Sequence, residues 1–177
     1  MKRTRSGSIA AVAAGVAAAS LLLAGYASQP VSDGGTVAGL IKLKGNAPSL
    51  GPHPVHKPSQ VPACGQTVPD EQILTGPGKS LANVVVWLEG IERGAPARPR
   101  RLKIDQKECR FVPRVQAATR GSQVTLTSRD ATLHNIHAYL GRRTLFNVAI
   151  PTKGVRIKKR LTRPGVVSLK CDAGHTW

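Results

Sequence analysis

The stretch Val166-Val167-Ser168-Leu169-Lys170-Cys171, followed by Asp172-Ala173-Gly174-His175-Thr176-Trp177, is the most informative part of this chain. Its first half predicts a strand whose apolar face carries Val167, Leu169 and Cys171, so the Cys171 thiol should point inward at the rim of the fold. His175 follows in the next loop, and Leu133-His134-Asn135-Ile136-His137 supplies another histidine. Two imidazoles and one thiolate are the ligand set of blue copper centres. The sequence therefore predicts a metal site of His134, Cys171 and His175.

The chain around these residues has the pattern of an all-β protein. Residues 46–80 carry seven prolines, which predicts a long ordered loop without helix. No stretch of 36–177 shows a convincing helical period, so we expect one antiparallel β-sandwich over these residues. The expected strands, all short and separated by turn residues, are 36–45, 82–88, 101–104, 110–117, 123–127, 134–139, 144–150, 155–161 and 165–171.

The N-terminal segment has the composition of a signal peptide. Lys2, Arg3 and Arg5 precede an apolar run over 9–24, and small residues before Ser28 suit a signal peptidase. We therefore expect a signal peptide over 1–27, a linker over 28–35, and a periplasmic or secreted protein. The alternative is an uncleaved N-terminus that anchors the chain to a membrane.

The strongly basic composition limits the choice of partners. The formal charge is +17, and loss of Lys2, Arg3 and Arg5 leaves 17 − 3 = +14. Nucleic acid is not expected for an exported chain, whereas an acidic redox protein, an anionic cell-surface polymer or an anionic membrane fits this charge. A basic cluster close in sequence to Cys171 is the predicted docking site, and it consists of Lys158, Lys159, Arg160 and Arg163.

Three cysteines leave one unpaired if the chain is oxidised. A Cys64–Cys109 disulfide would join the proline-rich loop to the sandwich and leave Cys171 as the free thiolate that a metal needs. The pairings Cys64–Cys171 and Cys109–Cys171 remain open, and either would abolish the metal site.

The candidate ligand segments resemble those of a known family. His134-Asn135, preceded by Asp130-Ala131-Thr132-Leu133, is similar to the first-ligand segment of the cupredoxins, the plastocyanin and azurin superfamily, and 171–177 resembles their ligand loop. The likeness covers 35–177 and is closer to exported cupredoxin-like proteins labelled methylamine-utilisation or plastocyanin-like. Further similar segments are Cys64-Gly65, 81–89, 105–114 and Thr144-Leu145-Phe146-Asn147.

The resemblance implies a Greek-key sandwich that binds copper and transfers one electron. His134, Cys171 and His175 would be the ligands, with His134 buried and the edge of His175 exposed, and Asn135 would support the thiolate through its backbone. Such relatives have a methionine directly after the tryptophan and then a final strand. Because Trp177 is the last residue here, we expect the axial ligand and the last strand to be missing. A truncated product, a three-coordinate site and a water ligand remain open.

Other functions compete with electron transfer. Zinc accepts the same ligands with water as a fourth, although copper suits this set better. The alternatives are a copper-storage or delivery protein, a truncated non-functional copper protein, and a metal-free basic module that binds an anionic polymer, membrane or protein partner. A Cys–His pair also suits a thiol nucleophile, but we find neither a third group to orient the histidine nor a motif for a small-molecule substrate. We therefore do not expect an enzyme.

Overall fold

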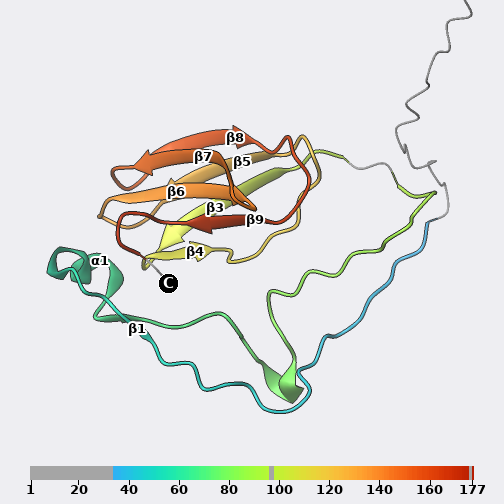
Figure 1. Ribbon diagram of the computed structural model, residues 1–177, viewed down its shortest axis with the longest axis horizontal. Coiled ribbons are helices and arrows are strands. Elements are labelled where there is room, and N and C mark those ends of the chain that lie inside the picture. The colour runs from blue at the N-terminus through green and yellow to red at the C-terminus, as the bar shows by residue number, and fades with distance from the viewer. Residues whose placement is uncertain (1–33, 96–97, 176) are drawn as a thin grey trace, which may run out of the picture.

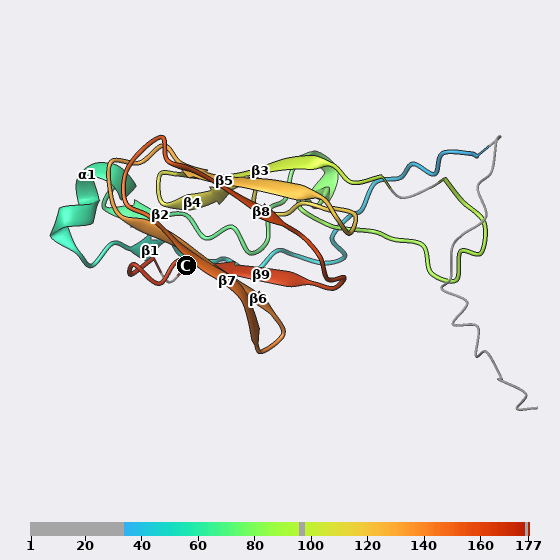
Figure 2. The same cartoon turned by 90° about the horizontal axis from the view of Figure 1, so that it is seen from above.

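Two β-sheets, stacked face to face, form the body of the protein (Figures 1 and 2). The computed structural model describes residues 34–95, 98–175 and 177, so the predicted signal peptide (1–27) and most of the predicted linker (28–35) lie outside the described residues. One sheet has the order β4-β3-β5-β8 and the other β7-β6-β9. The strands are β3 (Arg101–Lys107), β4 (Arg110–Val112), β5 (Gln123–Ser128), β6 (His134–Leu140), β7 (Arg143–Ile150), β8 (Arg156–Arg160) and β9 (Val167–Lys170).

The core lies between the two sheets and follows the alternation of the sequence. Val124 and Leu126 of β5 point inward to meet Ile136 of β6 and Ile150 of β7, and all four side chains are almost fully buried. Ile157 of β8 packs against the same cluster, while its neighbours Arg156 and Lys158 are exposed. The period of two along each strand therefore sets which side chains reach the interior.

Strand direction departs from the prediction at one pair. All strand pairs are antiparallel except β3 and β5, which run parallel from the pair Arg101–Gln123 to the pair Gln106–Ser128. The chain turns back along β4 after β3, and residues 113–122 return it to the start of β5 beside β3. Parallel neighbours need such a long connection. The all-β prediction is confirmed, but a purely antiparallel arrangement is wrong.

The proline-rich loop contains more regular structure than expected. It includes the strand pair β1 (His53–Pro54) and β2 (Thr67–Val68), the 3₁₀ turns η1 (Pro58–Gln60) and η2 (Pro77–Lys79), and the single helical turn α1 (Val61–Cys64). A proline near the start of a helix costs no hydrogen bond, and α1 has one at its N-terminal end. The prediction of no helix was therefore wrong for this one turn. None of the described helices is long and apolar enough to span a membrane.

Two predicted strands are absent from the sheets. Residues 36–45 and 82–88 are extended chain outside both layers (Figure 1). Lys42 forms an isolated bridge with Ser80, and no bridge among the described residues involves 82–88. The strand predictions for 36–45 and 82–88 are therefore wrong, and Trp87 in the second segment is 68 % exposed. Strand propensity describes fit to a half-buried surface and does not supply a neighbouring strand. The predicted strand 110–117 likewise ends at Val112.

Candidate metal centre

His134 reaches the interior because it opens strand β6. On this strand His134, Ile136 and Ala138 are buried at 0 % exposure, and Asn135 and His137 point to the other face. The inward row places an imidazole in the apolar core at the end of the sandwich where β6 begins. The predicted buried position of His134 agrees with this placement.

Cys171 and His175 come together through a tight loop directly after β9. The two residues form an isolated antiparallel bridge, so the chain reverses over Asp172, Ala173 and Gly174. Gly174 has a φ of +105°, and a side chain there would meet Lys57 Nζ at 2.8 Å. Glycine tolerates this backbone conformation without a steric penalty. The loop thereby directs the Cys171 thiol and the His175 ring to the same point.

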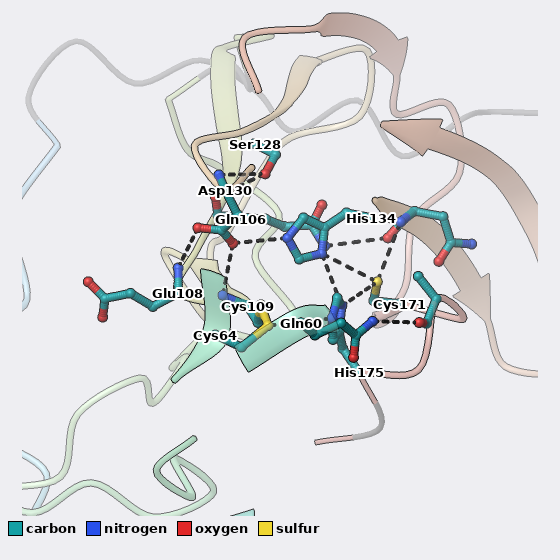
Figure 3. Close-up of polar contacts among 12 residues, drawn as sticks. Gln60, Cys64, Gln106, Glu108, Cys109, Ser128, Asp130, His134, Cys171 and His175 are labelled. Atoms are coloured by element: carbon teal, nitrogen blue, oxygen red, sulfur yellow. Dashed lines mark hydrogen bonds and ion pairs between the residues drawn. A yellow bond between two sulfur atoms is a disulfide. The ribbon is translucent and has the colours of Figure 1, made fainter. Parts of the chain in front are cut away.

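The three predicted ligand residues converge in the structure (Figure 3). His134 Nδ1 lies 3.0 Å from His175 Nδ1 and 3.7 Å from Cys171 Sγ, and Cys171 Sγ lies 3.2 Å from His175 Nδ1. Metal–nitrogen bonds of about 2.0 Å and metal–sulfur bonds of about 2.3 Å separate ligand atoms by about 3 to 4 Å. The triangle therefore has the size and the donor types to hold one metal ion.

A buried carboxylate fixes the orientation of His134. Asp130 accepts a hydrogen bond from His134 Nε2 at 2.9 Å and from the backbone N–H groups of Glu108 and Cys109 at 2.8 and 2.9 Å. Burial alone would raise the pKa of Asp130, but these hydrogen bonds lower it. Burial would also lower the pKa of His134, yet the hydrogen bonds to Asp130 and Cys171 raise that pKa to about 9. Because Nε2 of His134 is hydrogen-bonded to Asp130, Nδ1 of His134 is the nitrogen that can bind a metal.

The thiol of Cys171 lies in surroundings that favour its ionised form. Burial would raise its pKa, but hydrogen bonds from His134, His175 and the backbone N–H groups of Asn135 and Ala173 lower it to about 6. The Asn135 N–H donates to Cys171 Sγ at 3.4 Å, which is the contact that the resemblance implied. The Asn135 side chain also accepts from the backbone N–H of Asp172. Since the thiolate is the form that binds metals, the site is prepared for a cation.

The disulfide connectivity is now settled. Cys64 and Cys109 are bonded and buried, and Cys171 is a free buried cysteine among the described residues. The preferred pairing is confirmed, and the two pairings that would have consumed Cys171 are wrong. A buried disulfide indicates an oxidising, extracellular compartment.

The disulfide also covers His175, which corrects the predicted exposure of that ring. His175 is only 5 % exposed, with Cys64 Sγ 3.7 Å from its Nε2. Helix α1 is held over the ligand loop, because Gln60 Nε2 donates to the Ala173 carbonyl at 3.0 Å. Trp177 lies against the same ring at 5.4 Å between ring centroids, and its indole N–H donates to the Cys109 carbonyl. The proline-rich loop, which sequence patterns left without a role, therefore closes the site.

A small cavity of about 130 Å³ adjoins the cluster. Its lining includes Cys171, His175 and Trp177 together with Arg110 and Arg114. The buried side-chain oxygen of Gln106, which also lines the cavity, has no hydrogen-bond partner. Two of the three candidate ligands, Cys171 and His175, thus border this cavity.

The predicted docking residues do not form a single surface. Lys158 and Arg160 are exposed on the outer side of β8, whereas Lys159 turns the other way, with its ammonium group 5.8 Å from the centre of the Phe146 ring. Arg163 lies beyond the end of β8 in the connection to β9. The alternation of β8 therefore divides a cluster that is contiguous in sequence.

Sequence reasoning missed the role of Asp130. This residue lies in the quoted segment before His134, but the loop that precedes β6 carried no signal for the direction of its side chain. An acidic residue four positions before a candidate ligand was the available clue, since metal-binding histidines commonly donate their second nitrogen to a carboxylate.

No protein-family model, no curated protein and no solved structure matches this chain.

Proposed function

We propose that this chain is an exported copper protein that transfers single electrons, with His134, Cys171 and His175 as the copper ligands. The observation that carries the proposal is the convergence of one free thiol and two imidazole nitrogens within 3.0 to 3.7 Å of one another in a buried setting. Copper bound to such a set would supply a Cu(I)/Cu(II) couple. A thiolate and two imidazoles suit both oxidation states, which favours electron transfer over catalysis as the role of the site.

The residues around the site keep the ligand geometry constant. Asp130 holds the His134 ring, the Asn135 N–H holds the thiolate, and the Cys64–Cys109 disulfide fixes α1 over His175. Rigid support of this kind limits the rearrangement that accompanies a change of oxidation state. The partly buried Trp177 ring, which lies tilted against the enclosed His175 ring, gives a route for an electron towards the surface.

We also propose that the fold is a cupredoxin-like Greek-key sandwich. Its support is that the chain crosses between the two sheets three times, from β5 to β6, from β7 to β8 and from β8 to β9. Connections that link strands of opposite sheets are typical of Greek-key sandwiches. An acidic redox protein is the partner that suits the excess of cations.

A copper titration tests this function. We expect Cu(II) to give the full chain an intense blue thiolate-to-copper absorption band that saturates at one equivalent. Cys171→Ser should lack the band, and His56→Ala, which removes an exposed histidine outside the site, should keep it. A wild-type protein that stays colourless while it binds zinc would contradict the copper assignment.

A further inference from the structure

The outer face of the four-stranded sheet carries an ordered array of cations. Cross-strand partners share a face, and the side chains of β3, β5 and β8 that point away from the core line up in rows across the sheet. The three rows are Arg101–Gln123–Arg160, Lys103–Thr125–Lys158 and Asp105–Thr127–Arg156. In the first two rows, an uncharged side chain on β5 is thus flanked on both sides by a cation.

These cations are poorly neutralised by the protein itself. Among the described residues Arg101, Lys158 and Arg160 have no acidic partner, and Lys103 shares the buried Asp105 with Arg129. The flanking strands β3 and β8 lie about 10 Å apart, since each is a neighbour of β5. An anionic group above Thr125 or Gln123 would lie between two cations and within reach of both. We call Arg101, Lys103, Lys158 and Arg160 the cationic face.

The cationic face is directed away from the candidate metal centre. Its rows lie on the side of the sheet opposite the core, into which His134 points. The Asp105 row is at the metal end, because the adjacent Gln106 donates to the Asn135 carbonyl. The Arg101 row lies four residues back along β3, roughly 13 Å away. A redox partner on this face would be far from the copper ligands, so this face suits attachment better than electron exchange.

The spacing of the rows suggests the chemistry of the partner. Successive rows are two residues apart, or about 7 Å along a strand. A polyol-phosphate chain with three carbons, two oxygens and one phosphorus per repeat has six backbone bonds. If each bond extends the chain as far as a backbone bond of an extended polypeptide does, successive phosphates lie about 7 Å apart. This distance matches the spacing of the rows. Single-stranded nucleic acid has a similar repeat, but proteins that bind it use aromatic side chains as stacking platforms, and the rows contain none.

We propose that the cationic face binds a linear, base-free phosphodiester polymer of the cell envelope, with the polymer lying along β5 between the cations of β3 and β8. Each phosphate in the first two rows would contact one cation from either side. The Thr125 hydroxyl and the Gln123 amide would bond to the polyol oxygens. This role does not require copper, so it can be tested separately from the proposed electron transfer.

The test measures binding of metal-free full chain to end-labelled poly(glycerol phosphate) by fluorescence anisotropy over a range of salt concentrations. The face variant combines Arg101→Gln, Lys103→Gln, Lys158→Gln and Arg160→Gln. The control variant removes the same charge at four exposed positions elsewhere, with Lys44→Gln, Arg142→Gln, Arg143→Gln and Lys153→Gln. In the face variant Asp105 keeps Arg129 as a partner. A triple variant that spares Lys103 replaces the face variant if the latter does not fold.

We expect the face variant to bind at least about 30-fold more weakly than wild type at low salt, and the control variant to stay within about threefold. The slope of log affinity against log salt should fall by about 1.4 in the face variant, at about 0.7 for each of the two phosphates that the cationic face would contact. Equal losses in both variants would show charge attraction without a site and would overturn the proposal. Equal affinity of wild type for oligo(dT) would overturn the assignment to a base-free polymer.

Discussion

Replacing Asp130 by asparagine should weaken both the fold and the metal site. In the native protein the Asp130 carboxylate accepts three hydrogen bonds, from two backbone N–H groups and from His134 Nε2, all between 2.8 and 2.9 Å. An asparagine keeps one acceptor oxygen and turns an NH₂ group towards the remaining donors. Each buried donor left without an acceptor costs about 1 to 3 kcal/mol. We therefore expect Asp130→Asn to lower the free energy of unfolding of the metal-free protein by about 3 kcal/mol.

The same substitution should reduce metal affinity. Loss of the carboxylate partner of a ligand histidine typically weakens binding tenfold to a hundredfold, because the ring is no longer held in one tautomer and orientation. Urea denaturation gives the stability change, and competition with a chelator at a temperature where the variant is folded gives the affinity. Asp172→Asn is the matched control. Asp172 lies next to Cys171 but is exposed and bonded to His137, which is not a candidate ligand.

The comparison with the control decides the role of Asp130. A stability loss below about 1 kcal/mol together with an unchanged metal affinity would refute the argument that Asp130 positions His134. Equal effects of the two substitutions would show that only the negative charge near the site matters.

Three other predictions concern the disulfide, the thiol and the core. Replacing Cys64 and Cys109 by serine opens a closed loop with a sequence separation of 45. In the chain-entropy model this should lower the free energy of unfolding by about 4 kcal/mol. Urea denaturation measures the change, and an unchanged unfolding midpoint would argue against a stabilising role of the disulfide. In the metal-free protein, absorbance of the Cys171 thiolate at about 240 nm should rise with a midpoint near pH 6, and His134→Ala should move that midpoint towards the ordinary value of 9.0. Because the folded pKa is the lower one, the thiolate contributes stability that is fully present above pH 9 and is lost as the pH falls through 6. Leu126 is fully buried between the sheets, so Leu126→Ala should lower the free energy of unfolding by about 3 kcal/mol. The control Leu133→Ala, at a 53 % exposed position, should lower it by less than about 1 kcal/mol. Similar decreases for the two variants would mean that Leu126 is not in the core.

Local alternation allowed the core strands to be predicted, whereas the set of three ligand residues was supported mainly by the resemblance of their segments to the cupredoxins. A period of two on β9 predicted that Cys171 points inward, and the resemblance implied the buried position of His134, which shares the inward face of β6 with Ile136. His175 could be placed near Cys171 because only a short loop joins the two residues. The wrong strand prediction at 82–88 shows the limit of this reasoning. Whether a segment joins a sheet depends on a free sheet edge formed by residues distant in sequence, and not on the segment alone.

Long-range features of the site could not be predicted in the same way. The choice among three possible disulfides depends on the position of Cys64 in a loop of low regularity. The burial of His175 depends on that disulfide and on contacts between Gln60 and the ligand loop, more than 100 residues apart in sequence. The cationic face combines residues of two strands, β3 and β8, that are not direct neighbours, and its rows became evident only from the register of both strands with β5.

The most direct test of the central claim is X-ray absorption spectroscopy at the copper edge of the copper-loaded full chain. We predict one short sulfur scatterer from Cys171 and two nitrogen scatterers from His134 and His175, with one nitrogen lost in His134→Ala and the sulfur lost in Cys171→Ser. A copper coordination shell without sulfur, or one that neither substitution changes, would contradict the assignment of these three residues as the metal site.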